Sequence, residues 1–78
     1  MDTEIAYTVN RQAILETIKR SGMSITAVCK AMGIARSTLY RKLDGKLYFT
    51  TREITDLYRL LPCDPLTFIT YFFTLDVA

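Results

Sequence analysis

The side chains best suited to bind another molecule are gathered in one short segment. If this segment is helical, one face carries four polar groups: Arg36, Ser37, Tyr40 and Arg41. Two guanidinium groups and two hydroxyl groups can donate hydrogen bonds to phosphate oxygens and to the acceptor atoms of bases. This chemistry favours the binding of a polyanion over the transformation of a substrate.

The composition argues against catalysis and against a metal centre. The 78 residues include no histidine, which is the commonest general base and metal ligand. The two cysteines, Cys29 and Cys63, lack the close spacing of a zinc site, and a disulfide between them is possible but not implied. We therefore expect no enzyme activity, no cofactor, no metal and no small-molecule ligand.

Charge is unevenly distributed along the chain. Residues 11–46 hold eight Lys and Arg against two acidic residues, a balance of +6, whereas the remainder holds two against six, a balance of −4. Such asymmetry indicates a surface oriented toward a polyanion, or a solvated helical face. No signal peptide and no membrane-spanning stretch is visible, so we expect one globular domain, 1–78, in the cytoplasm.

Glycine and proline divide the chain into pieces of helical length. We expect five helices, over about residues 8–21, 24–32, 36–43 and 51–61 and in a short piece that begins at Asp64-Pro65. The fourth has the clearest start, because Thr50 and Glu53 have the spacing of a capping box. In the third, Leu39 and Leu43 are one turn apart and should point inward.

The C-terminal segment alternates in the manner of a strand from residue 71 to 77. A lone strand needs a partner for its backbone groups, either the N-terminal stretch 4–7 or the same strand of a second subunit, and the sequence does not choose. One small domain has little room for so many large side chains. We therefore expect part of this tail to form a dimer interface, through Tyr71, Phe72, Phe73 and Leu75.

The segment 25–44, ITAVCKAMGIARSTLYRKLD, contains two short amphipathic pieces separated by the turn Gly33-Ile34-Ala35. Gly33 supplies the positive φ that such a turn needs, and the small side chain of Cys29 lets the two helices approach closely. This pattern resembles the helix-turn-helix of phage repressors and Cro-type regulators. The flanking helices resemble the lambda-repressor-like domain, which implies an all-α, compact five-helix fold with a short C-terminal extended or β tail.

The resemblance implies a sequence-specific regulator of the phage or prophage type, a repressor or a Cro-like protein. It would bind double-stranded operator DNA as a homodimer in a bacterial host cell. In this motif the second helix, about Arg36–Leu43, lies in the major groove. We expect base contacts from Arg36, Ser37, Tyr40 and Arg41. We expect contacts to the DNA backbone from Ser24, Thr26, Thr38, Lys42 and Lys46.

Two positions depart from the motif. Ala35 stands where Ser or Thr often precedes the second helix, so the first amides of that helix must find water or phosphate. An apolar residue often stands at the position of Lys42; we expect Leu43 to take the inward place and Lys42 to turn outward toward the DNA backbone.

A second function from another class remains open. The same fold could be a protein-binding module of the antirepressor type, which would use the hydrophobic C-terminal tail to dock another regulator. The motif also does not separate a maintenance repressor from its Cro-type antagonist, or either from an activator.

Overall fold

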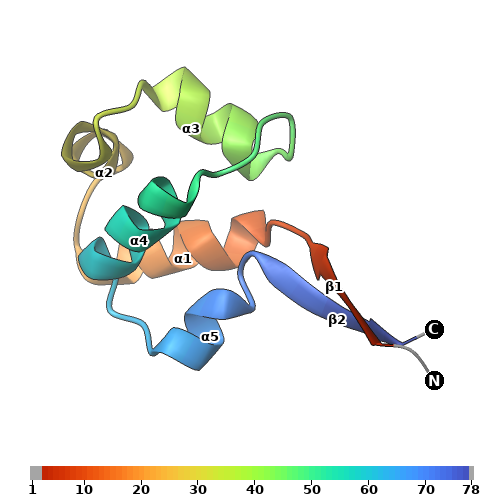
Figure 1. Ribbon diagram of the computed structural model, residues 1–78. Coiled ribbons are helices and arrows are strands. Elements are labelled where there is room, and N and C mark those ends of the chain that lie inside the picture. Colours follow the sequence, from red (N-terminus) through yellow and green to blue (C-terminus); the bar gives the residue numbers. More distant parts are fainter. Residues whose placement is uncertain (1–2, 78) are drawn as a thin grey trace.

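The computed structural model describes residues 3–77, with the side chains of residues 5–74 (Figure 1). Five helices lie between two strands in the order β1 (Thr3–Tyr7), α1 (Arg11–Ser21), α2 (Ile25–Met32), α3 (Arg36–Leu43), α4 (Thr51–Leu60), α5 (Pro65–Ile69) and β2 (Phe73–Val77). The structure confirms the expected compact five-helix domain of the helix-turn-helix type with a strand-like tail.

Local signals set the ends of these helices. The side chains of Asn10 and Ser24 each accept a hydrogen bond from the backbone amide three residues later, at 3.1 and 3.0 Å, and so begin α1 and α2. At the start of α4, Thr50 and Glu53 form the expected capping box. Gly33, with a φ of 74°, ends α2 in the left-handed region and turns the chain toward α3.

The hydrophobic core lies where the five helices meet. Its buried members are Ile14, Ile18, Val28, Cys29, Met32, Leu39, Leu43, Phe49, Leu57, Leu61, Phe68, Tyr71 and Phe72. Phe72 is 0% exposed, and its ring centroid lies 5.2 Å from that of Phe49 and 5.1 Å from that of Phe68. Burying one ring of this size contributes about 1.5–3 kcal/mol, so these three rings are a large share of the stabilisation in a small domain.

The tail strand pairs with the N-terminal stretch of its own chain. β1 and β2 form a two-stranded antiparallel ribbon in which Thr3 lies opposite Val77 and Tyr7 opposite Phe73. Two further backbone hydrogen bonds extend this pairing toward the helices, from the amides of Thr8 and Asn10 to carbonyls of residues 72 and 71, at 2.8 and 2.7 Å. Figure 1 shows the ribbon leaving the helical body beside the start of α1.

Two of the four residues expected at a dimer interface lie in the core instead. Tyr71 is 6% exposed and Phe72 is 0% exposed, because both belong to the turn between α5 and β2 that closes the core. Phe73, the first residue of β2, is half-buried. Leu75 pairs with Ile5 in the ribbon, and its side chain lies outside the described ones.

All five helices are short. The longest, α1, has 11 residues and therefore rises about 16 Å, roughly half of the hydrocarbon thickness of a bilayer. Within residues 3–77, no helix combines the length and the apolar character that crossing a membrane requires.

Candidate nucleic-acid interface

One face of α3 is polar and open to solvent. Arg36, Ser37 and Arg41 are exposed on this helix. On its other side Leu39 and Leu43, 0% and 2% exposed, enter the core as expected. In Figure 1, α3 lies at one end of the molecule, and α1 and α4 lie between it and α5. Because Arg36, Ser37 and Arg41 are exposed, their side chains are accessible to a partner molecule.

Close packing of α2 against α3 supports this face from behind. Cys29 is 3% exposed and free, and it is the small core residue that the sequence predicts. Burial raises the pKa of its thiol, and the nearby positive charge of Arg36 opposes this shift only in part. The thiol is therefore protonated and inert at neutral pH, and its role is to let the two helices approach.

The N-termini of α2 and α3 add hydrogen-bond donors. Ala35 precedes α3 without any side-chain cap, so the first amides of that helix are unsatisfied within the protein. Ser24 uses its oxygen as an acceptor to cap α2, which leaves its hydroxyl proton available, and Thr26 beside it is exposed. Amides and hydroxyls arranged in this way at helix N-termini suit phosphate groups.

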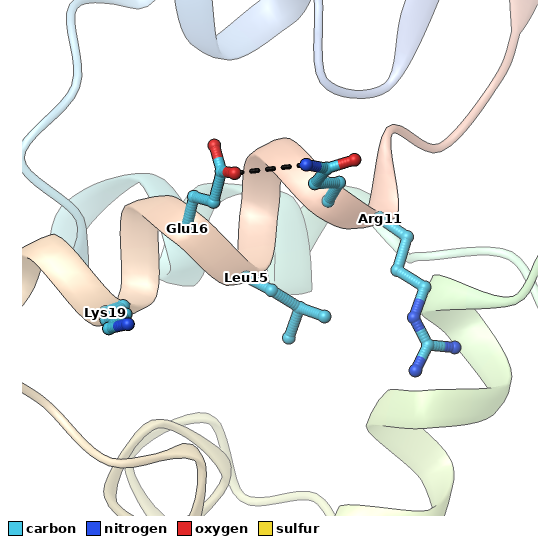
Figure 2. A pocket seen from close by; sticks show the side chains of 5 residues that line it. Arg11, Leu15, Glu16 and Lys19 are labelled. Carbon is cyan, nitrogen blue, oxygen red and sulfur yellow. Dashed lines mark hydrogen bonds between the residues drawn. The ribbon is translucent and has the colours of Figure 1, made fainter.

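Arg11 joins the site from α1, and no local pattern in the sequence predicts this contact. Its guanidinium carbon lies 5.6 Å from the ring centroid of half-buried Tyr40 and its Nη1 pairs with Asp44, the residue that ends α3. Figure 2 shows Arg11 pointing from α1 toward α3. The two charged side chains are 46% and 37% exposed, so the pair is worth about 0–1 kcal/mol. Its main effect is to cover part of Tyr40 and restrict the positions of that ring.

Lys42 does not turn outward, and this corrects the expectation for it. The residue is 7% exposed, and its Nζ pairs with the carboxylate of Glu53 in α4. Leu39, Lys42 and Leu43 stand at positions i, i+3 and i+4, which share one face of a helix, so both leucines cannot point inward without Lys42. The apolar residue that the motif often has at this position was the signal for burial.

Glu53 is the counter-charge that makes this burial possible. Its own partial burial would raise the pKa of the carboxyl, but hydrogen bonds from the Lys42 ammonium and the Thr50 amide outweigh that effect. The pKa of Glu53 is therefore lower than usual, and the carboxylate is ionised at neutral pH.

Of the eight basic residues in the segment 11–46, Arg11 and Lys42 are paired with carboxylates, and the other six are exposed. These six are Lys19, Arg20, Lys30, Arg36, Arg41 and Lys46. Lys46 lies in the loop directly after α3, and Thr38, also expected at the DNA backbone, is half-buried in α3. Four of the six cations, Lys30, Arg36, Arg41 and Lys46, lie in α2, in α3 and in the loop that follows, and they give this region a positive field.

A shallow groove of about 380 Å³ follows one side of α1 (Figure 2). It is lined by Arg11, Gln12, Leu15, Glu16 and Lys19. Gln12 donates a hydrogen bond to the Glu16 carboxylate at 3.2 Å, and the guanidinium of Arg11 is engaged by Asp44. Among the described residues, no group of three or more Cys, Asp or Glu side chains is placed to hold a metal ion. Since the polar groups of Arg11, Gln12 and Glu16 in this groove already pair within the protein, the exposed face of α3 is the stronger candidate for a functional site.

A second groove is more apolar and lies between α5 and the ribbon. Its volume is about 650 Å³, and it is lined by Ile5, Ile69, Thr70, Phe73 and Thr74. Ile5 is 72% exposed and Ile69 is 52% exposed, which is unusual for large apolar side chains that lie together. We call this surface the ribbon groove. The sequence pattern predicts a contact role for this end of the chain, but two of the four residues that it indicates, Tyr71 and Phe72, are buried.

One family comparison covers the elements that build the α3 face. A family model described as the helix-turn-helix domain of resolvase matches residues 6–46, which is more than half of the 78 residues. The matched span contains all of α1, α2 and α3 and ends in the loop at Lys46. No curated protein and no solved structure matches the chain.

Proposed function

The chain belongs to the family of resolvase-type helix-turn-helix domains, which bind DNA, and from this premise we propose that it is a sequence-specific transcriptional regulator. In this proposal α3 is the recognition helix and lies in the major groove of double-stranded DNA. The observation that carries the proposal is the exposed polar face of α3, held outward by two buried leucines. The proposal includes no catalytic step.

The first residues of α3 are the ones that read bases. Arg36 stands at the start of the helix, where this motif meets base edges, and a guanidinium can donate two parallel hydrogen bonds to O6 and N7 of guanine. Ser37 and Arg41 share the same exposed face. Tyr40 contributes its hydroxyl group and the ring edge that Arg11 leaves uncovered.

A second set of residues fixes the register of the protein on the DNA backbone. It comprises Ser24, Thr26, Thr38 and Lys46 together with the free amides at the start of α3. Lys42 is left out of this set because its ammonium is buried against Glu53.

We assign the protein to the phage repressor and Cro-like class of regulators. The five short helices around one hydrophobic core and the strand after α5 support this assignment. In that class the protein occupies an operator in the cytoplasm of a bacterial host cell and needs no cofactor.

A single α3 contacts too few base pairs to recognise an operator specifically, and we propose that two copies of the protein bind DNA together. The helix has eight residues and is about 12 Å long, so it spans only a few base pairs. Two-fold symmetry lets two half-sites be read at once. The ribbon groove supplies the contact surface, with Ile5, Ile69 and Phe73, in place of Tyr71 and Phe72. A two-stranded sheet is also marginal alone and gains from further packing.

The ribbon groove also supports a second candidate function, a protein-binding module of the antirepressor type. Its exposed Ile5 and Ile69 could dock another regulator in place of a second copy. A DNA-independent complex with a different protein, unaffected by salt, would favour this function over the first.

Selection of bound sequences from random duplex DNA tests the proposed function. We expect an enriched palindrome whose half-sites are one helical turn, about 10–10.5 base pairs, or a multiple of it apart. If the purified protein enriches no sequence at any salt concentration, it is not a sequence-specific regulator.

Two substitutions then assign the contacts. Arg36→Ala should relax the preference at one position of each half-site, at a cost of about 1–3 kcal/mol against the preferred base. Lys46→Ala should weaken all sequences alike and reduce the salt slope by about 0.9 per protomer. Arg59→Ala, which removes an exposed cation from the last turn of α4, is the matched control and should change neither quantity. An intact preference in Arg36→Ala would show that α3 is docked differently.

A further inference from the structure

A shielded ion pair joins α3 to α4. Lys42 is the single charged side chain among the buried residues of the segment 5–74, and its Nζ contacts Oε1 of Glu53. The two side chains are only 9% and 14% exposed. Water and salt ions therefore screen this pair much less than a pair on the surface.

The carboxylate oxygen that contacts Lys42 also accepts a second hydrogen bond. Oε1 of Glu53 also accepts the backbone amide of Thr50 at 2.8 Å, while the hydroxyl of Thr50 accepts the amide of Glu53 at 3.1 Å. One atom thus connects the last turn of α3, the end of the following loop and the first turn of α4. The ring of Phe49, whose centroid is 5.9 Å from Nζ, covers Lys42 from another side.

We propose that the Lys42–Glu53 pair sets the rotation and tilt of α3, and through them the base preference of its outer face. Lys42 is then a positioning residue that acts through the helix and does not touch DNA. The part of the inference that concerns base preference rests on the proposed function. The part that concerns the helix can be measured without DNA.

The geometry of α3 supports this role. The apolar contacts of Leu39 and Leu43 are not directional, so they tolerate small rotations of the helix. The shielded ion pair restricts α3 further, because a rotation that separates Nζ of Lys42 from Oε1 of Glu53 leaves two poorly solvated charges without a partner. Since successive residues are about 100° apart around a helix, Tyr40 lies about 160° and Arg36 about 120° away from Lys42, and both move with any rotation that the pair permits.

The test removes both charges and keeps the shape of the site. The double variant Lys42→Met with Glu53→Gln conserves volume, and a glutamine at the third helical position still accepts the Thr50 amide. Replacement of a buried pair by uncharged groups of similar volume commonly preserves folding. The double variant Lys42→Gln with Glu53→Gln, which also removes both charges and lets the two side-chain amides hydrogen-bond to each other, is the second variant if the first does not fold.

The matched control uses a more exposed ion pair of α4, the helix that contains Glu53. Arg52 and Asp56 lie one turn apart in α4, 4.0 Å from Nε to Oδ2, and the arginine side chain is 91% exposed. Arg52→Met with Asp56→Asn changes the net charge by zero, as the test variant does, but leaves α3 untouched.

Amide hydrogen exchange of the free protein measures the attachment of α3. In the test variant we expect the amides of residues 39–44 to exchange about tenfold faster relative to those of α1, because the end of α3 opens locally. Selection and titration with duplex DNA measure the consequence. The ratio of affinities for the best sequence and its single-base variants should fall about tenfold, with non-specific affinity unchanged since no phosphate contact is lost. The control should alter neither quantity.

Unaltered exchange of α3 in the test variant overturns the inference, and so does faster exchange with an unaltered base preference. If the wild-type protein selects no sequence, the proposed function fails, and the exchange measurement alone decides whether the pair positions α3.

Discussion

Tyr71 offers a test of whether the start of the tail belongs to the core or to a partner. Its hydroxyl lies 2.9 Å from Oγ1 of Thr17 in a buried position. Thr17 donates its own proton to the carbonyl of Ala13 at 2.7 Å, so the tyrosine hydroxyl must be the donor of the pair. In Tyr71→Phe, Oγ1 of Thr17 still donates to that carbonyl and still accepts from Arg20 at 3.1 Å. Among the described side chains, the one other group that loses a partner is the thiol of Cys63, 3.7 Å from the hydroxyl.

These contacts set the size of the effect. Tyr71→Phe leaves no strong polar group buried without a partner, so we expect a loss of about 0.5–1.5 kcal/mol. Thr17→Val removes the acceptor and leaves the buried Tyr71 hydroxyl without a strong one, so we expect about 1–3 kcal/mol. The double variant should cost less than the sum of the two, because both remove the same hydrogen bond.

Urea denaturation followed by circular dichroism, at one fixed protomer concentration, gives these three free energies of unfolding. Thermal unfolding should agree, with a shift of about 4–8 °C for each kcal/mol in a domain of this size. Sedimentation equilibrium of Tyr71→Phe measures self-association, which should be unchanged if Tyr71 belongs to the core. Weaker self-association without any loss of stability would refute the buried position of Tyr71 and restore its assignment to a dimer interface.

Two further predictions concern the ribbon groove and the α3–α4 link. Ile69→Glu places a charge in the apolar groove, so it should abolish self-association in sedimentation velocity. The control Leu66→Glu, on the same helix but outside the groove lining, should leave self-association intact. Equal effects of the two variants would exclude the groove as the interface. The pKa of Glu53 is lower in the folded protein than its ordinary value of 4.5, so its stabilising contribution is present above that value and is lost as the pH falls through the folded pKa. Urea midpoints measured down to pH 3 should fall less steeply in Glu53→Gln than in the wild type, and an identical pH dependence would contradict the lowered pKa.

The helices could be predicted because their ends are determined by neighbouring residues. α3 spans Arg36–Leu43, as the spacing of its leucines and the turn at Gly33 indicate. α4 follows directly from the capping box at Thr50, and α5 follows from Asp64 as N-cap, whose side chain accepts the Thr67 amide at 3.0 Å. Each of these signals acts within about four residues, so no knowledge of the tertiary structure is needed.

The environment of the tail could not be predicted in the same way. Alternation identifies a strand, but the partner is chosen by contacts between residues about 70 positions apart, which a local pattern does not contain. The alternating pattern also begins two residues before the strand does, at residue 71. Tyr71 and Phe72 belong to a turn, with the amide of Phe72 bonded to the carbonyl of Ile69 at 3.1 Å, and side chains in that turn enter the core. β2 begins only at Phe73.

The distribution of charge along the sequence predicts the positive surface less well, because it does not show which cations are paired with carboxylates in the fold. Of the eight basic residues in 11–46, Arg11 and Lys42 are paired, and Lys42 is paired with a residue of the acidic remainder. That remainder is therefore more than a solvated surface, because Glu53 both begins α4 and holds the buried charge of α3. The two attachments of α3 also differ in kind. The Arg11–Asp44 pair is exposed and weakens with salt, whereas the Lys42–Glu53 pair is shielded and persists, so α4 fixes α3 under conditions in which its link to α1 is largely screened.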